Sequence, residues 1–333
     1  MKRLILIQFF FMFLFVQIHY CLAQGIKVSS EIPRDTSFTL NGTVQKITKD
    51  YPEAKPVLPV KSNELHEVKN LVYSAYGERN LRLDLFSPQN TNQKLPGVIL
   101  VHGGGWRSGD RSMEIPMAQH LAMKGYITAT AEHRLSPEAK YPAAVSDIKA
   151  AVRWMRANSE KYNIDSNKIA LYGVSSGGHL AAMVGATNGI ERYEGNGGNP
   201  SHSSDVQAVI DIDGVLDFTD PAESGKDNDP AKPSVGNLWL GSSYKDNPDI
   251  WIEASPLSYV TIKSPPYIFI NSSLPRFHAG RDIFIGKLNS FNIYSEVHTI
   301  AETPHPFWLF HPWFDEAFSY IKTFLDKTLK GIE

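Results

Sequence analysis

Short apolar runs alternate with helix-like patterns along most of the chain, from about Glu67 onward. Period-two alternation over residues 68–75 and 81–86, on either side of a short turn, predicts a β-hairpin. Helical spacing of apolar residues predicts helices at residues 143–158 and 314–329. Further short apolar runs predict buried strands at residues 97–101, 127–131, 169–172, 206–212, 267–270 and 293–300.

This alternation predicts both the fold class and the domain organisation. Parallel strands that are joined through helices use right-handed crossovers, so we expect an α/β fold with a doubly wound, mostly parallel sheet covered by helices on both faces. The strands recur too regularly for two domains, and we expect one domain over residues 66–333. Residues 24–65 are polar, with three prolines near their end, and are predicted to form an N-terminal arm or linker.

The first 23 residues have the layout of a secretory signal peptide. A basic start at Lys2-Arg3 precedes an apolar stretch over residues 4–16, and small residues at Cys21 and Ala23 precede Gln24. The apolar stretch is shorter than the roughly 20 residues that span a bilayer, and no later run is long enough. We expect cleavage after Ala23 and export to the periplasm or the extracellular space, with lipid attachment at Cys21 as the alternative.

Composition excludes several classes of function. The 333 residues include 33 Lys and Arg against 35 Asp and Glu, a formal charge of −2, which becomes −4 once the predicted signal peptide is removed. A nucleic-acid-binding domain would be expected to carry a basic patch instead. The single cysteine lies in the predicted signal peptide, which excludes disulfides and cysteine-bound metal sites in the exported chain. We expect no metal and no cofactor.

The sequence Gly173-Val174-Ser175-Ser176-Gly177 follows a predicted strand and precedes a helical run at residues 178–186. It matches G-x-S-x-G in a strand–turn–helix context, where the glycines allow a tight turn that exposes the serine hydroxyl. Partial positive charge at the helix N-terminus lies beside that hydroxyl. Ser175 is therefore the candidate nucleophile, and a glycine-rich turn without catalytic function is the alternative.

A second glycine-rich segment, His102-Gly103-Gly104-Gly105-Trp106, also follows a predicted strand. Consecutive glycines let backbone amides approach a ligand closely, as an acyl-transfer site requires where oxyanion charge develops. The amides of Gly104, Gly105 and Ser176 form the candidate oxyanion hole. Trp106 is expected to line the substrate pocket. A flexible loop or a phosphate cradle is the alternative, although the lysine of a phosphate-binding loop is absent.

A serine hydroxyl needs an adjacent base near neutral pH, and that base is usually an imidazole. His305 lies late in the chain, after the predicted strand at residues 293–300 and before the last helix. This position fits the chain order serine, acid, histidine that accompanies a G-x-S-x-G turn. His311 is the nearby competitor, but the last helix is expected to have begun by then. We therefore expect His305 to act as the general base.

Together these segments resemble the α/β-hydrolase family, and within it the hormone-sensitive-lipase-like branch of secreted bacterial feruloyl and acetyl esterases. The resemblance runs from about Val72 to Leu329 and includes the stretch His133-Arg134-Leu135-Ser136-Pro137-Glu138. It implies an α/β-hydrolase fold with an eight-stranded sheet and hydrolysis of carboxylic esters without a cofactor. We expect a carbohydrate acetylesterase acting on a plant polysaccharide such as xylan or pectin. A serine exopeptidase and a non-catalytic binding protein of the same fold are the alternatives.

The acid of the expected triad is the point at which the chain departs from the family pattern. The family usually carries an aspartate a few residues after the strand predicted here at residues 267–270, and Pro275 stands near that position. Asp282 is the first carboxylate that follows, and it is the predicted acid. Asp217, which follows the preceding strand, is the alternative. Turn formation and capping would explain Asp217 and the nearby Asp213 without any catalytic role.

Three basic side chains lie close together in the same loop, namely Arg276, His278 and Arg281. Because guanidinium groups suit carboxylates, we hypothesise that this group binds a uronate near the scissile ester, as in an acetylated pectin. The alternative is a solvated loop whose arginines pair with Asp282 or with the backbone.

Two segments, residues 188–204 and 220–258, are rich in glycine and polar residues and are expected to form insertions over the cleft. Trp239 and Trp251 lie in the second of them. These indoles either stack on sugar rings or pack inside a lid, and packing is the commoner role for a buried tryptophan.

Overall fold

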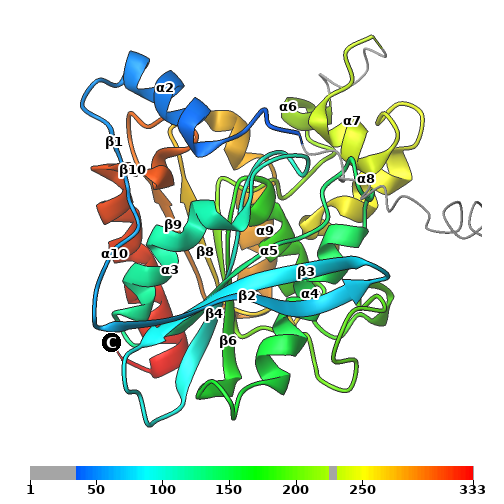
Figure 1. The fold of residues 1–333 in the computed structure, drawn as a ribbon. Helices are drawn as coiled ribbons and strands as arrows, with labels where there is room; N and C mark the ends of the chain where they lie inside the picture. Colours follow the sequence, from blue (N-terminus) through cyan, green and yellow to red (C-terminus); the bar gives the residue numbers. More distant parts are fainter. Residues whose placement is uncertain (1–34, 225–230, 333) are drawn as a thin grey trace, which may run out of the picture. The chain divides into compact units, whose positions relative to one another are not determined.

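An eight-stranded sheet in the order β2-β3-β5-β4-β6-β7-β8-β9 forms the centre of the computed structural model, which describes residues 35–224 and 231–332 (Figure 1). β3 pairs antiparallel with both β2 and β5, and the other neighbouring strands are parallel. The predicted α/β-hydrolase fold, with a doubly wound and mostly parallel sheet, is confirmed. The strands are β2 (Leu65–Tyr76), β3 (Arg79–Pro88), β4 (Leu95–Val101), β5 (Ile127–Ala131), β6 (Ile164–Val174), β7 (Ala208–Ile212), β8 (Tyr267–Asn271) and β9 (Ser295–Thr299).

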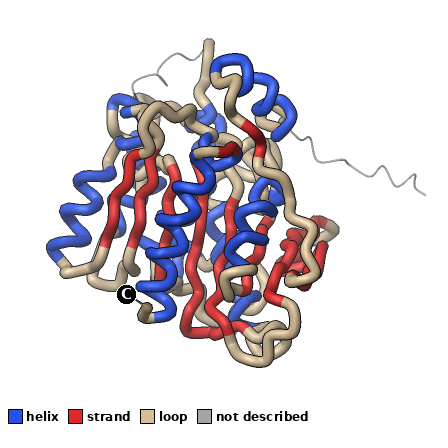
Figure 2. The backbone as a smooth tube through the Cα atoms, turned by 90° about the vertical axis from the view of Figure 1, so that its left-hand side faces the viewer, coloured by secondary structure: helices blue, strands red, loops and turns tan. Residues whose placement is uncertain are grey.

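Helices cover both faces of this sheet (Figure 2). The larger ones are α3 (Ile115–Ala122), α4 (Ala143–Ala157), α5 (Ser176–Ala186), α9 (Arg281–Ser290) and α10 (Trp313–Leu325). α3 and α10 share one apolar core with one face of the strands, and α4, α5 and α9 share a second core with the other face. Short 3-10 turns are η1 (Arg111–Glu114), η2 (Glu191–Tyr193), η3 (Pro256–Tyr259), η4 (Pro275–His278) and η5 (Phe307–Leu309).

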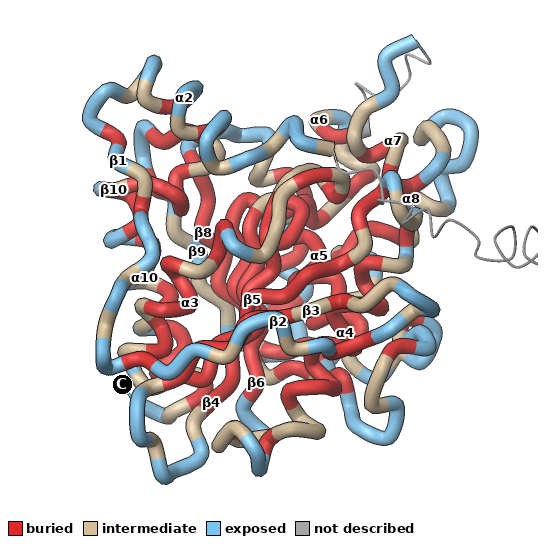
Figure 3. Tube along the Cα trace, in the orientation of Figure 1, coloured by how far each residue is buried: buried red, intermediate tan, exposed pale blue. Residues whose placement is uncertain are grey.

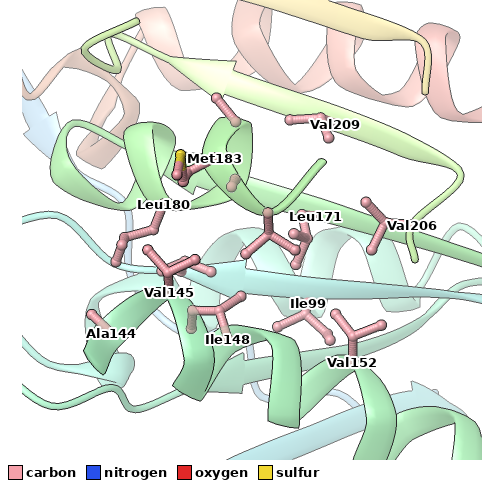
Figure 4. Packing of buried hydrophobic residues seen from close by; sticks show 14 of the residues in the cluster. Ile99, Ala144, Val145, Ile148, Val152, Leu171, Leu180, Met183, Val206 and Val209 are labelled. Atoms are coloured by element: carbon pink, nitrogen blue, oxygen red, sulfur yellow. The ribbon is translucent and has the colours of Figure 1, made fainter. Parts of the chain in front are cut away.

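The predicted hairpin and the predicted strands are present, whereas α3 was missed. Its sequence is apolar almost all round, and Met117, Ala118 and Leu121 are all buried, so it lacks the one-sided pattern by which helices are recognised. The apolar residues of α4 recur with helical spacing: Ile148 and Val152 lie toward Ile99 of β4, and Val145 lies beside Leu180 of α5 (Figure 4). The central strands β4, β5, β7 and β8 are almost entirely buried, whereas the edge strands β2 and β9 are partly exposed (Figure 3).

The described part of the predicted N-terminal arm or linker, residues 35–65, contains structure of its own. α2 (Leu40–Asp50) begins after Thr39, whose Oγ1 accepts the Gly42 amide at 3.2 Å, and β1 (Lys55–Pro56) pairs antiparallel with β10 (Phe310–His311). Ile47 and Val57 are buried in the core shared with α10. These residues therefore form an arm packed on the domain instead of a linker. The predicted signal peptide, including Cys21, lies outside the described residues.

The second predicted insertion contains α6 (Pro221–Ser224), α7 (Val235–Leu240) and α8 (Pro248–Ala254). Trp239 and Trp251 are fully buried there, and Phe218 contacts both indoles. Of the two roles considered for these tryptophans, the structure therefore shows packing within the insertion. Across residues 35–224 and 231–332, no helix combines the length and the apolar character needed to cross a membrane.

Candidate active site

Ser175 occupies a strained turn between β6 and α5. Its backbone has φ 54° and ψ −122°, a conformation that residues other than glycine rarely adopt. The strand and the helix on either side hold it in place. A β-carbon on Gly173 would lie 2.0 Å from the Gly177 carbonyl oxygen, and one on Gly177 would lie 2.2 Å from the Val101 carbonyl oxygen. Both glycines of the motif are therefore required by close backbone approach, and the turn matches the predicted nucleophile elbow.

His305 lies against this serine. Its Nε2 is 2.8 Å from Ser175 Oγ, and its Nδ1 is 2.9 Å from Asp213 Oδ2. In the neutral tautomer that fits both contacts, Nδ1–H donates to the carboxylate and Nε2 accepts from the serine hydroxyl. The expected pairing of Ser175 with His305 is thus present, and the geometry is that of a hydroxyl beside its base. His311 is elsewhere, with its Nδ1 2.7 Å from Asp315.

The prediction that Asp282, or alternatively Asp217, is the acid is wrong, because the carboxylate beside His305 belongs to Asp213. Asp282 is directed away: its side chain is 81% exposed and accepts a hydrogen bond from Arg281 Nε at 2.9 Å. Asp217 instead caps a turn, accepting from the amide and the hydroxyl of Thr219 at 2.8 and 2.7 Å. Neither is available to orient the imidazole.

Asp213 is held firmly at the carboxyl end of β7. Its amide donates to the Ile270 carbonyl at 3.1 Å, and its Oδ1 accepts from the Ser272 amide at 2.8 Å and from Asn271 Nδ2 at 3.4 Å. The side chain is fully buried. A carboxylate fixed in this position orients the imidazole and stabilises its charged form. The sequence indicated this residue only by its position: Asp213 is the first residue beyond β7, and β8 runs parallel beside β7.

The candidate oxyanion donors lie at the same edge of the sheet. Within the described chain, the amides of Gly104, Gly105 and Ser176 form no hydrogen bond with another residue. Ser176 is the first residue of α5, where an amide has no partner inside the helix. A β-carbon on Gly103 would lie 3.1 Å from Ser175 Cβ, which places the glycine loop against the nucleophile. Their role in holding an oxyanion stays a prediction.

Trp106, which was expected to line the substrate pocket, is almost fully buried among aromatic rings. Only 4% of the residue is exposed, and its Nε1 donates to His179 Nδ1 at 3.1 Å. Its indole stacks on that of Trp239, with 4.9 Å between ring centroids and 14° between the planes. Because Trp106 follows three glycines and is surrounded by aromatic rings, it anchors the glycine loop to the interior. The sequence placed this residue at the site without showing which way its side chain turns.

The three basic residues expected to bind a uronate have partners within the chain. Arg276 donates from Nε and Nη2 to Glu223 at 2.8 and 3.0 Å. Arg281 contacts Asp282 and donates from Nη1 to Asn271 Oδ1 at 2.9 Å, and His278 Nε2 is 3.0 Å from the Ser272 carbonyl. The alternative of a paired loop therefore fits the structure better than a cationic subsite.

Asp211 is a second buried carboxylate at this edge. Burial raises its pKa to about 7. The negative charge of Asp213 adds to that rise, and the Gly214 amide, which donates to Asp211 Oδ1 at 2.9 Å, opposes it. The ordinary value is 3.8, so the folded chain keeps this proton between about pH 4 and 7 while the unfolded chain has lost it. Wild-type stability from this group therefore falls as the pH rises through that interval.

We expect Asp211→Asn to remove this dependence, because an amide cannot ionise. The difference in the free energy of unfolding between the variant and wild type should be more favourable to the variant at pH 8 than at pH 4.5, by about 1–3 kcal/mol. Urea unfolding at both pH values measures it, with Asp249→Asn as a control that removes an exposed carboxylate. Stability curves of wild type and Asp211→Asn that run parallel from pH 4.5 to 8 would contradict the assignment.

No group of three or more His, Cys, Asp or Glu side chains in the described ranges is arranged to hold a metal ion. The groups gathered at this edge are a hydroxyl, an imidazole, a carboxylate and backbone amides that have no hydrogen-bond partner within the described chain. This set can transfer a proton and stabilise a developing oxyanion, which is the chemistry of acyl transfer through a serine.

Comparisons with known proteins agree with this chemistry. A family model described as BD-FAE matches residues 83–274. Esterase LipC of Mycobacterium tuberculosis is 31% identical over 179 residues, which are 54% of this chain and 44% of LipC. The chain spans a little under half the length of the first curated relatives that it matches.

Solved structures give a similar result. A bifunctional GH43-CE protein of Bacteroides eggerthii superposes with a TM-score of 0.67 and 26% identity, over 79% of this chain and 38% of that one. A truncated carbohydrate esterase from gut microbiota superposes with a TM-score of 0.66 and 25% identity, over 82% of this chain and all of that one. These likenesses extend well beyond the residues at the site.

Proposed function

Because the chain belongs to the BD-FAE family of hormone-sensitive-lipase-like α/β hydrolases, we propose that it is a serine carboxylesterase. The observation that carries this proposal is the unbroken series of contacts from Ser175 Oγ through the His305 ring to Asp213 Oδ2, at 2.8 and 2.9 Å. A second support is that the amides of Gly104, Gly105 and Ser176 have no hydrogen-bond partner among the described residues. The alternative of a non-catalytic binding protein would be supported by a site without an acid, and Asp213 beside His305 argues against it.

The first half of the proposed reaction forms an acyl-enzyme. As Ser175 Oγ attacks the ester carbonyl, His305 Nε2 takes the hydroxyl proton, and Asp213 stabilises the imidazolium that results. The carbonyl oxygen becomes an oxyanion beside the amides of Gly104, Gly105 and Ser176. His305 then gives its proton to the leaving alcohol oxygen as the carbon–oxygen bond breaks.

The second half releases the acid. A water molecule enters where the alcohol left, and His305 takes a proton from it as its oxygen attacks the acyl carbon. The tetrahedral intermediate collapses, the bond to Ser175 Oγ breaks, and His305 returns the proton to that oxygen. The serine hydroxyl and the neutral imidazole are thereby restored.

For the substrate we propose an acetyl or similarly short acyl ester on a plant polysaccharide. Support comes from structural neighbours that are described as a carbohydrate esterase and as a bifunctional GH43-CE protein. A neutral backbone such as xylan is favoured over pectin, because Arg276 and Arg281 are already paired inside the chain. The N-terminal sequence, with its predicted signal peptide, supports export to where such polymers occur.

The substrate proposal is tested by comparing acetate release from acetylated xylan and acetylated pectin. Feruloyl ester, aryl acetate and aminoacyl arylamide substrates complete the set. We expect kcat/KM on acetylated xylan to exceed that on acetylated pectin by about tenfold, which corresponds to about 1.4 kcal/mol, with no cleavage of the arylamides. A preference for pectin would restore the uronate hypothesis. Faster release from arylamides than from esters would favour the exopeptidase alternative.

A further inference from the structure

The segment between β8 and α9 places an aromatic ring flat against His305. The Phe277 ring, in η4, lies parallel to the imidazole with 3.8 Å between the ring centroids and 7° between the planes. Trp308 meets the same imidazole at right angles, with 5.1 Å between centroids and 87° between planes. His305 is therefore contacted on a face and by a perpendicular ring, in addition to its hydrogen bonds.

Phe277 is itself held by its surroundings. Its carbonyl accepts a hydrogen bond from Asn271 Nδ2 at 3.0 Å, and its amide donates to the Leu274 carbonyl at 3.1 Å. The adjacent Arg276 has its guanidinium carbon 5.4 Å from the Phe277 ring centroid and pairs with Glu223 of α6. The ring thus sits on a backbone that is fixed from β8 and from the insertion.

The side chain that anchors Phe277 also reaches the acid. Asn271 Nδ2 lies 3.4 Å from Asp213 Oδ1, and Asn271 Oδ1 accepts from Arg281 Nη1 at 2.9 Å. One amide at the end of β8 therefore ties the carboxylate and the aromatic residue to a common position. Asn271 therefore sets Asp213 and Phe277, two of the groups that contact His305, relative to each other.

From this geometry we propose that Phe277 is a positioning residue for His305, an inference that rests on the proposed esterase function. The outer torsion of a histidine side chain has broad preferences, so packing must fix the ring. The hydrogen bonds to Ser175 and Asp213 act within the ring plane and leave tilting out of that plane weakly opposed. A parallel ring at 3.8 Å opposes that tilt directly.

The same contact favours the state that His305 adopts during reaction. The face of an aromatic ring carries partial negative charge and attracts a cation within about 6 Å of its centroid. His305 takes up a proton and becomes an imidazolium in both halves of the proposed mechanism. Phe277 therefore stabilises the reacting state more than the ground state, and its loss should lower kcat more than it raises KM.

The test compares Phe277→Leu, which keeps an apolar side chain but removes the ring, with Phe277→Tyr, which keeps the ring. On an aryl acetate, Phe277→Leu should lose about tenfold in kcat with KM within about twofold, whereas Phe277→Tyr should retain at least about half of kcat. Covalent labelling of Ser175 by a small fluorophosphonate should slow by a similar factor in Phe277→Leu. Labelling reports on the serine–histidine pair without a sugar substrate.

Phe291→Leu is the matched control, because it removes an exposed aromatic ring at the end of α9 away from His305. It should react like wild type. If Phe277→Leu fails to fold by circular dichroism, Phe277→Met serves in its place. Wild-type kcat and labelling rate in a folded Phe277→Leu or Phe277→Met would overturn the inference alone, because the esterase itself would still be active. A wild-type chain without esterase activity would overturn the proposed function and this inference with it.

Discussion

Replacing Ser175 with alanine should lower kcat/KM on an aryl acetate by a factor of about 10⁴ to 10⁶. The change removes the hydroxyl oxygen that lies 2.8 Å from His305 Nε2, so no acyl-enzyme can form on this residue. What remains should be the modest acceleration from backbone donors that still surround the ester carbonyl. The fall should appear in kcat, with KM for the aryl acetate changed much less.

Initial rates of aryl acetate hydrolysis measure this effect, with the thermal unfolding midpoint as a check on folding. Ser201→Ala is the matched control, since it makes the same chemical change at an exposed serine in the 188–204 segment. Ser201→Ala should match wild type. Ester hydrolysis by Ser175→Ala at a rate above about a tenth of wild type would mean that another residue carries the reaction.

The second large effect concerns the acid. Asp213→Asn should lower kcat by about 10³ to 10⁴, because an amide in place of the carboxylate favours the wrong imidazole tautomer and leaves the imidazolium unstabilised. The Ser272 amide, which donates to Asp213 Oδ1 at 2.8 Å, can keep its acceptor if the asparagine oxygen takes that position. The site should therefore lose reactivity without losing its shape.

Asp282→Asn and Asp217→Asn provide the comparison within one chain. Asp282 is exposed beside Arg281 and Asp217 caps a turn at Thr219, so both variants should stay within about twofold of wild type in kcat. Michaelis–Menten analysis of the three variants on one aryl acetate ranks the three carboxylates by the loss in kcat that each substitution causes. A larger loss in Asp282→Asn than in Asp213→Asn would return the acid to the position expected from the family pattern.

The strands, the nucleophile turn and the base were open to prediction because each depends on local sequence. Ser175 follows a buried strand and is flanked by glycines that close backbone contacts require, and His305 follows the last strand of the series. Parallel strands place their carboxyl ends at one edge, which brings these two loops together. The sequence could therefore identify the pair from order and spacing alone.

The acid was missed because the relevant contact is not local. Asp213 stands immediately before Gly214, a pairing that turn formation explains fully, and nothing in the sequence shows that His305 lies 2.9 Å from its carboxylate. Expectation followed the family position after β8, where this chain instead carries Phe277 against the imidazole. That aromatic contact left no periodic signal, since η4 is a single short turn.

For the residues that were expected to face the substrate, the sequence indicated a position near the site but not the partners of the side chains. Trp106 and Arg276 both lie near the site, yet one packs inward on Trp239 and the other pairs with Glu223. Which partner a long side chain takes depends on neighbours from distant segments, and composition near a strand end does not specify them. α3 was missed for another reason, because its sequence is mostly apolar and lacks the one-sided pattern of a surface helix.

Intact-mass measurement after exposure to a small fluorophosphonate tests the serine–histidine–aspartate assignment most directly. Wild type should gain the mass of a single adduct, localised to Ser175 by peptide mapping, and Asp213→Asn should gain it at least about a hundredfold more slowly. Ser175→Ala should gain none under the same conditions. Rapid labelling of Ser175→Ala, or equal labelling rates in wild type and Asp213→Asn, would contradict the account.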